Sequence, residues 1–213
     1  MEPIHTYTAY WGTDDDELQY AAELSEIYGT IHHPVKIEGI FEMFKKVLPF
    51  VDRPHRFNLW VAFLYEAAAG DLRENAYIGE GPDEHFGGYW YKEEKSYQEY
   101  WSGVLEYSVP THEVLAALYG MGLHIPFLKL DVRETLPYYD YKYRNKELLR
   151  TIYQGTIPDI ALNRKKQPGR TPWVELWEQE AAPYIKASTP TTRAEAHKLI
   201  EKWVIEYWLA CRS

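Results

Sequence analysis

The sequence has little of what marks three large classes of protein. Its single cysteine, Cys211, cannot form an internal disulfide, which is typical of a reducing compartment. Its 23 Lys and Arg residues are outnumbered by 32 Asp and Glu residues, and a net charge of −9 argues against a DNA or RNA partner. No apolar run approaches the roughly 20 residues that span a bilayer, and residues 1–11 lack the pattern of a secretory signal. These absences predict a soluble, cytoplasmic protein with no nucleic acid and no membrane partner.

Apolar and aromatic residues, in contrast, are plentiful. Of the 213 residues, 46% are hydrophobic and 16% are aromatic, which is enough for one well-buried domain or for one domain with a small appendage. We expect a main domain over residues 1–185 and a C-terminal amphipathic helix within 186–213. The Pro- and Thr-containing stretch 186–193 is the best candidate for a hinge between them.

The first half of the sequence alternates between strand and helix patterns. Strand patterns, rich in Tyr, Thr and β-branched residues, occupy residues 4–11, 30–37 and 75–78. Helix patterns occupy residues 13–28, 38–49 and 57–69. Gly29 is suited to end the first helix in a left-handed conformation. This alternation predicts an α/β fold with parallel strands and buried crossovers.

The second half of the sequence is predominantly helical. One apolar stripe at helical spacing consists of Tyr97, Tyr100, Trp101, Val104 and Leu105. A second stripe consists of Ala196, Leu199, Ile200, Trp203, Val204, Tyr207 and Trp208. It follows a capping pair formed by Thr192 and Glu195. We interpret the first stripe as core, with an aromatic substrate site as the alternative, and expect the second to pack against another element.

An acidic, glycine-rich turn follows the strand pattern at 75–78. The segment "GEGPDEHFGGY" places the carboxylates Glu80, Asp83 and Glu84 among four glycines, which allow unusual backbone conformations and close ligand approach. Ligands of an open parallel sheet bind beyond the carboxyl ends of its strands, where this turn is expected. Carboxylates there would act on phosphates through Mg²⁺, or on a substrate amine as acceptor or base. The alternative is an acidic helix start, in which Asp83 caps the helix and Glu84 complements its dipole.

The turn and its surroundings resemble the asparagine synthase family of ATP-dependent amide-forming synthetases. "GEGPDEHFGGY" is similar to the family's "SGEGxDExFGGY", and "YGTIHHPVKI" to its "LGTxHHEV". Further along, "YGMGLHIPFL" is similar to "GxExRxPFLD", "KELLR" to "KxLLR", and "IPDIALNRKKQP" to "LPxxxxxRxKQxF". These segments occur in the same order over residues 4–170, which is far more specific than one motif. The resemblance implies a parallel sheet of the ATP-pyrophosphatase type, similar to the adenine nucleotide alpha hydrolases, with a helical C-terminal part.

The resemblance also implies a reaction and a set of site residues. In this family ATP adenylates a carboxylate, pyrophosphate leaves, and an amine or ammonia attacks the acyl-adenylate to form an amide. Glu80 would lie beside the acyl-adenylate, Asp83 would bind Mg²⁺ with pyrophosphate, and Lys165 would stabilise the phosphates. The residues expected to contact the nucleotide are Gly79, Gly81, Ala9 and Arg164. Glu80, Asp83 and Lys165 are therefore expected to converge on one cleft. A solvated basic loop is the alternative interpretation of the cluster at residues 164–166.

The sequence also departs from the family pattern. The family's phosphate-binding segment "SGGxDS" and the first strand that precedes it do not occur, and no glutaminase domain with an N-terminal cysteine is present, since residue 2 is Glu. Gly122, His124 and Lys129 replace Glu, Arg and Asp of "GxExRxPFLD", which suggests a linked exchange of charges, because removing one member alone would leave a buried charge unpaired. Ile78 replaces the serine before "GEG".

Two functions are compatible with this pattern. The first is part of an amide-forming ligase that uses ATP and Mg²⁺ and receives its phosphate loop from elsewhere. The second is a family-derived binding or interaction protein without ATP chemistry. A sheet without its first strand has two unpaired inner edges, so we expect a companion chain that carries the phosphate loop, or a homo-oligomer, to cover them. Direct pairing of the strand at 4–11 with that at 75–78 is the alternative.

Overall fold

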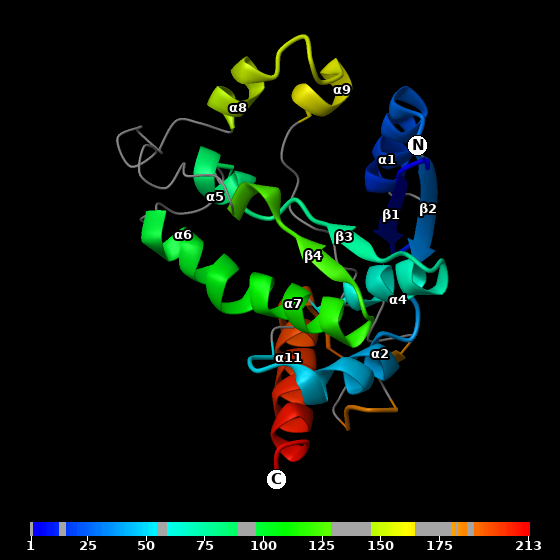
Figure 1. Cartoon of the computed structure of the whole chain (residues 1–213). Helices are drawn as coiled ribbons and strands as arrows, with labels where there is room; N and C mark the ends of the chain where they lie inside the picture. The colour runs from blue at the N-terminus through cyan, green and yellow to red at the C-terminus, as the bar shows by residue number, and fades with distance from the viewer. Residues whose placement is uncertain are drawn as a thin grey trace.

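The fold was analysed in a computed structural model of the chain (Figure 1). The structure describes residues 2–12, 16–54, 59–88, 97–128, 146–164, 180–181, 183–186 and 190–213. Within these residues it is a mixed α/β fold with short parallel sheets, as the alternation of patterns predicts.

The N-terminal part of the chain is a strand, a helix and a parallel strand. β1 (His5–Tyr10) and β2 (Ile31–Lys36) pair in parallel, from His5 opposite Ile31 to Tyr10 opposite Lys36. α1 (Asp16–Tyr28) forms the crossover and is followed by Gly29, whose φ of 64° is left-handed. The expected strands and the glycine stop of this helix are confirmed.

A second parallel pair lies further along the chain. β3 (Asn75–Tyr77) pairs with β4 (Gly122–His124), and the chain between them is largely helical. Within the described residues the four strands form two separate sheets, so β1 does not pair with β3. The direct pairing that we considered as an alternative is therefore not formed.

Helices build the hydrophobic core beneath these sheets (Figure 1). The contributing elements include α2 (Ile40–Val47), the short 3₁₀-helix η1 (Leu48–Phe50), α4 (Ala62–Gly70), α7 (Val109–Leu118) and α11 (Arg193–Ala210). α11 buries Ala196, Ile200 and Val204 in the same core as Phe41 and Phe44 of α2. The remaining apolar residues of its predicted stripe pack at the margin of that core. No helix of the described part of the chain is long and apolar enough to cross a membrane.

A change of helix type separates α6 (Tyr97–Gly103) from α7. The intervening residues Val104–Ser108 form a π-helix, η2. Pro110 lies in the first turn of α7 and has no N–H to donate to a preceding carbonyl, which favours a local departure from α-helical bonding. Trp101 and Val104 are buried as predicted, but Leu105 is 42% exposed. The prediction for Leu105 is wrong because the wider π turn rotates the face that follows Val104.

The short helices α8 (Glu147–Ile152) and α9 (Asp159–Leu162) lie at the opposite end of the fold from α11 (Figure 1). α5 (Pro82–Phe86) follows β3, and η3 (Pro126–Leu128) follows β4. α8 contacts α5, and α9 contacts α1. This arrangement brings the segment after β3 close to residues from the C-terminal half of the chain.

The start of α11 offers a test of the C-terminal region. Thr192 Oγ1 accepts a hydrogen bond from the Glu195 N–H at 3.2 Å, and the Glu195 carboxylate accepts from the Thr192 N–H at 3.3 Å. Thr192→Ala is expected to lower the free energy of unfolding in urea by about 1 kcal/mol, because it leaves a helix N–H without its acceptor. Thr192→Asn keeps a side-chain acceptor and should lower the free energy of unfolding much less. Equal losses would contradict a capping role.

Candidate functional site

The turn after β3 owes its shape to glycines at two positions. Gly81 has a φ of 108° and Gly87 a φ of 65°, conformations that residues with a Cβ rarely adopt. A Cβ on Gly81 would also lie 3.2 Å from Cβ of Phe127. Pro82 then occupies the first position of α5, where its missing N–H costs no helical hydrogen bond. The two glycines therefore set the beginning and end of this one-turn helix.

A third glycine makes room for a carboxylate. A Cβ on Gly88 would lie 1.7 Å from Oδ1 of Asp83, which is an impossible contact. The Gly88 N–H also donates to the Asp83 carbonyl oxygen at 2.8 Å. The chain thus folds back tightly over Asp83, and this close approach explains why carboxylates and glycines are crowded together here.

His85 is a buried residue that holds the turn against neighbouring elements. Its side chain is 2% exposed, and its Nε2 donates to the Phe127 carbonyl oxygen at 2.9 Å. The indole ring of Trp101 meets the imidazole edge-on, with 4.5 Å between the ring centroids. These contacts fix α5 against η3 and α6, so His85 has a structural role in this turn.

Glu80 lies beside a buried histidine of α7. Its Oε1 is 3.6 Å from Nε2 of His112, whose Nδ1 is 3.0 Å from the Tyr65 hydroxyl. If Nε2 carries the proton and faces the carboxylate, Nδ1 accepts from the Tyr65 O–H. Tyr65 and His112 are both buried, so this pair holds the orientation of the imidazole toward Glu80.

The ionisation of Glu80 follows from these neighbours. Burial raises its pKa, but His112 and the hydroxyl of Ser108 stabilise the anion, and the net result is a pKa below its usual range. Burial and the Glu80 charge raise the pKa of Tyr65, which keeps the phenol protonated. With 32% of its side chain exposed, Glu80 is an ionised and accessible carboxylate at neutral pH.

Asp83 has a different partner, which lies far along the chain and directly precedes α8. Nζ of Lys146 lies 3.0 Å from Asp83 Oδ1, and the Lys146 N–H donates to the Phe86 carbonyl oxygen at 2.9 Å. Lys146 has a left-handed φ of 58°, which is uncommon for a residue with a side chain. Sequence analysis gave Lys146 no role, although it begins the "KELLR" segment that resembles the family's "KxLLR".

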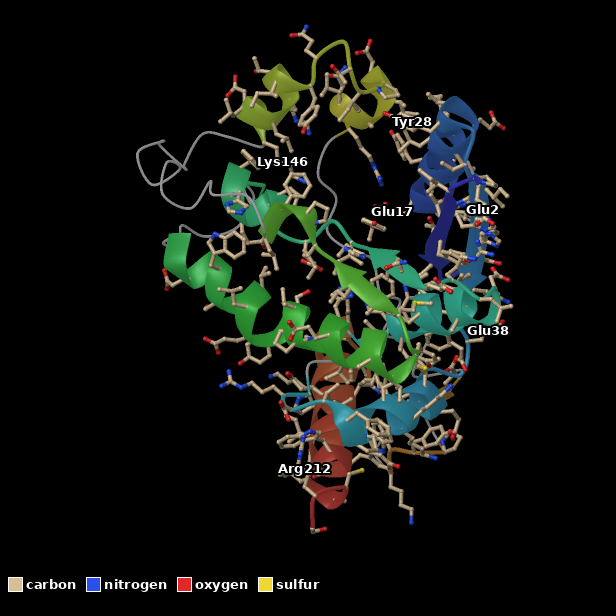
Figure 2. All side chains as sticks on the ribbon, viewed as in Figure 1. Glu2, Glu17, Tyr28, Glu38, Lys146 and Arg212 are labelled. Carbon is tan, nitrogen blue, oxygen red and sulfur yellow. The ribbon has the colours of Figure 1, made fainter. Side chains whose placement is uncertain are left out.

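A pocket of about 420 Å³ opens beside this ion pair. Pro82 of α5 and residues of α8 and α9 line it, together with the cations Lys146, Arg150 and Arg164. Glu17 and Lys146, both labelled in Figure 2, are among its lining residues. The volume lies within the range of small-molecule sites, and three cations among its lining residues suit an anionic ligand.

Arg164 is held in the pocket by α1. Its guanidinium pairs with both carboxylate oxygens of Glu17, at 2.6 and 2.9 Å, and stacks on the Tyr20 ring at 4.2 Å. The Arg164 carbonyl oxygen accepts from Arg150 at 2.7 Å. Arg164, which directly precedes the basic pair 165–166, therefore lines the same pocket as Lys146. Lys146 is the ion-pair partner of Asp83.

The other predicted site residues lie in several places. Gly79 and Gly81 are in the turn, with Gly79 exposed and Gly81 buried. Ala9 is in β1 opposite Val35 and packs at the margin of the core. Lys165 lies outside the described residues, so its convergence with Glu80 and Asp83 stays a prediction.

His112, Tyr65 and Arg150 also went unrecognised in the sequence analysis. No sequence motif marked His112 or Tyr65, which lie in helices whose pattern indicates only core. Arg150, in contrast, ends the "KELLR" segment, whose resemblance to the family's "KxLLR" could have marked it as a candidate site residue.

The donor groups of this site limit how it could bind a metal ion. The described residues contain no group of three or more His, Cys, Asp or Glu side chains that could hold a metal ion. A Mg²⁺ ion that arrives with ATP needs only one or two protein carboxylates, because phosphate oxygens and water complete its octahedron. Asp83 suits that single-carboxylate role, in competition with the Lys146 ammonium.

The positions that differ from the family pattern form a local arrangement around Asn75. Nε2 of His124 lies 2.9 Å from Asn75 Oδ1, and the His124 ring stacks on Tyr77 at 4.4 Å. A Cβ on Gly122 would lie 2.7 Å from the same Asn75 oxygen. Gly122 and His124 thus accommodate one neutral side chain together, whereas Lys129 lies outside the described residues.

Comparison with known proteins gives one family match. The family model described as asparagine synthase matches residues 1–122, which is more than half of the 213 residues. The matched range includes β1, the acidic turn and the whole of α7. No curated protein matches the chain.

The contact between Gly88 and Asp83 predicts a large difference between two glycine substitutions. Gly88→Ala is expected to lower the free energy of unfolding by about 1–3 kcal/mol, because the new methyl group displaces the Asp83 carboxylate from Lys146. Gly79→Ala is the matched control, since a Cβ there meets nothing within 4 Å, and it should change the value by less than about 0.5 kcal/mol. Urea unfolding of both variants checks this, and similar effects would contradict the crowding argument.

The environment of Glu80 predicts a pH dependence of stability. Because its folded-state pKa lies below the usual 4.5, Glu80 stabilises the fold above that value, and this contribution is lost as pH falls through the folded-state pKa. Glu80→Gln is therefore expected to reduce the loss of unfolding free energy between about pH 5 and about pH 3. The exposed Glu23→Gln should retain the wild-type profile. An unchanged profile in Glu80→Gln would show that His112 and Ser108 do not stabilise the anion.

Proposed function

Because the chain belongs to the asparagine synthase family of ATP-dependent amide-forming synthetases, we propose that it is part of a ligase that activates a carboxylate for amide formation. The carboxylate oxygen attacks the α-phosphorus of ATP, pyrophosphate leaves, and an acyl-adenylate forms. An amine or ammonia then attacks the acyl carbon, the amine proton is lost, and AMP leaves. The observation that carries this proposal is the acidic turn, with Asp83 ion-paired to a lysine of the cationic pocket.

Glu80 is proposed to lie beside the acyl-adenylate and to orient the incoming amine. Its lowered pKa makes it an anion at neutral pH, which suits a hydrogen-bond acceptor for an ammonium or amine. The same lowering makes it a weak general base, since an efficient base has a pKa near the working pH. We therefore assign Glu80 to amine positioning and charge stabilisation, with His112 as the residue that positions it.

The cations are proposed to neutralise the phosphates. Lys165 would stabilise the charge on the transferring phosphates, and Arg164 would contact the nucleotide from the same segment. Lys146 and Arg150 line the pocket that Arg164 also lines, and they extend this positive surface. Asp83 would hold Mg²⁺, which supplies a Lewis acid to the phosphates.

The remaining nucleotide contacts and the phosphate loop complete the proposal. Gly79, Gly81 and Ala9 are proposed to contact the nucleotide within a sheet of the ATP-pyrophosphatase type. Residues 1–213 contain no "SGGxDS" segment, whose backbone N–H groups would hold pyrophosphate. We propose that this loop is supplied separately, by a preceding segment of a longer polypeptide or by a companion chain. Activity would then require both parts.

An interaction protein without ATP chemistry is the second candidate. The Asn75, Gly122 and His124 arrangement supports it, because Gly122 and His124 occupy positions where the family pattern has Glu and Arg. The two candidates differ in a measurable way, since only a ligase needs to bind an acyl-adenylate.

Ligand binding tests the proposed function directly. The full chain is titrated calorimetrically with aspartyl sulfamoyl adenosine, a stable acyl-adenylate analogue. Glu80→Gln and Lys165→Ala are each expected to raise Kd about tenfold, because each removes a charge-assisted contact. Lys198→Ala on α11 is the control and should bind as the wild type does. Absence of binding, or equal binding by all variants, would favour the interaction protein.

Catalysis by the chain alone gives a further prediction. With ATP, Mg²⁺, aspartate and ammonia, the purified chain is expected to release no pyrophosphate above background. Carboxylates and one metal ion do not replace fixed backbone dipoles at the phosphates. Robust pyrophosphate release that Lys165→Ala abolishes would show that no separate phosphate loop is needed.

A further inference from the structure

The helices α8 and α9 give the pocket beside the acidic turn an apolar wall. Both helices lie at the far end of the fold from α11 (Figure 1), and no residue of either is fully buried or belongs to the described hydrophobic core. The apolar residues that they and the turn between them contribute to the pocket are Leu149, Tyr153, Ile157, Ala161 and Leu162. These side chains therefore line the pocket instead of the core.

The polar side of the same pocket has the charge of a single cation. Lys146, Arg150 and Arg164 line it. Lys146 pairs with Asp83 at 3.0 Å, and Arg164 pairs with Glu17 at 2.6 Å. Three positive and two negative charges leave one net positive charge, which suits a ligand with one anionic group. Nε of Arg164 is buried and has no hydrogen-bond partner among the residues that the structure describes, so this guanidinium has donor capacity beyond Glu17.

The size and the two-sided lining of the pocket limit which ligands suit it. Its volume of about 420 Å³ lies near the lower end of the roughly 300–1,000 Å³ typical of small-molecule sites. A polyphosphate carries several charges, and contact with the apolar wall would remove water from them without replacing its hydrogen bonds. Aspartate, with two carboxylates and an ammonium group, has the same disadvantage. A ligand with one carboxylate and a compact apolar body matches both sides.

We propose that this pocket holds the acyl substrate, and that this substrate is a monocarboxylate with an aromatic or branched aliphatic body. Its carboxylate lies at Lys146, next to Asp83 of the acidic turn, and its body packs against Leu149, Ile157 and Leu162. Burial of the body gives affinity, and the charge-assisted contact gives orientation. The inference rests on the proposed function and narrows its substrate from carboxylates in general to this class.

Chemical-shift titration by NMR tests the pocket in the full chain, without nucleotide or Mg²⁺. The probe is phenylbutanoate. Its matched controls are phenylbutanamide, which has the same body without the charge, and succinate, which has the charge without the ring. Phenylbutanoate is expected to shift the amides of α8 and α9 and to bind about tenfold or more tightly than either control, because only it uses both sides of the pocket. The amides of α11 are the reference and should not shift.

A pair of alanine substitutions tests the apolar wall. Ala161→Trp is expected to raise the Kd of phenylbutanoate about tenfold or more, because the indole takes the space of the ligand's body. Ala194→Trp, at an exposed alanine of α11, is the matched control and should bind as the wild type does. Neither alanine belongs to the described hydrophobic core, so both variants are expected to keep the fold.

Substitution of the cations tests the position of the carboxylate. Lys146→Gln is expected to raise the Kd of phenylbutanoate to that of phenylbutanamide and to leave the Kd of the amide unchanged. Arg150→Gln leaves the ion pair between Lys146 and Asp83 in place and should also reduce the preference for the acid over the amide. Equal weakening of both ligands by both variants would contradict a carboxylate at this side of the pocket.

Two further results would overturn the proposal. One is binding of phenylbutanoate no tighter than that of the amide or of succinate. The other is pyrophosphate that shifts the same amides of α8 and α9 and binds more tightly than phenylbutanoate, since the pocket would then be a phosphate site. The titration involves no acyl-adenylate analogue, and the nucleotide part of that analogue is common to every acyl substrate. A failure here is therefore distinct from a failure of the proposed ligase function.

Discussion

The Asp83 carboxylate occupies space that any side chain on Gly88 would need, and this steric constraint shapes the acidic turn. Because Gly88 folds over Asp83, the carboxylate is directed to Lys146, a residue distant in sequence. Lys146 in turn donates its N–H to Phe86 at the end of α5. One ion pair and one backbone hydrogen bond thus attach the cationic pocket to the acidic turn. The pocket between α5, α8 and α9 depends on this attachment.

Two carboxylates only three residues apart have different chemical surroundings. Asp83 is paired with an ammonium group, whereas Glu80 is held by Ser108 and by His112, which Tyr65 orients. An ion-paired carboxylate is available to a metal only by displacing its cation, while Glu80 keeps its charge and its access to solvent. The division of labour that we propose, with Asp83 toward phosphates and Glu80 toward the amine, comes from the family resemblance, and these surroundings are compatible with it. It does not follow from residue type, which is nearly the same.

Features specified by neighbouring residues were predictable from the sequence. The strand, helix and strand of the first 36 residues, the glycine stop at Gly29 and the capping box at Thr192 depend on local pattern, and the structure contains them. The acidic turn was identified because its residues are contiguous. His112 and Lys146 reach the turn only through tertiary contacts. His112 lies in a helix whose pattern indicates only core, and the "KELLR" resemblance does not reveal that Lys146 pairs with Asp83. Leu105 was predicted to be buried but is exposed, because a π turn alters the helical periodicity. The spacing of apolar residues in the sequence does not indicate where such a turn occurs.

His112 connects the helical core to the proposed chemistry. It belongs to α7, and its Nε2 faces Glu80 at 3.6 Å. Tyr65, which holds the imidazole, belongs to α4. Both side chains are buried, and a low local dielectric strengthens the interaction of an imidazole with a carboxylate. The orientation of Glu80 is therefore set from the helical core, because α4 and α7 supply the tyrosine and the histidine that hold it.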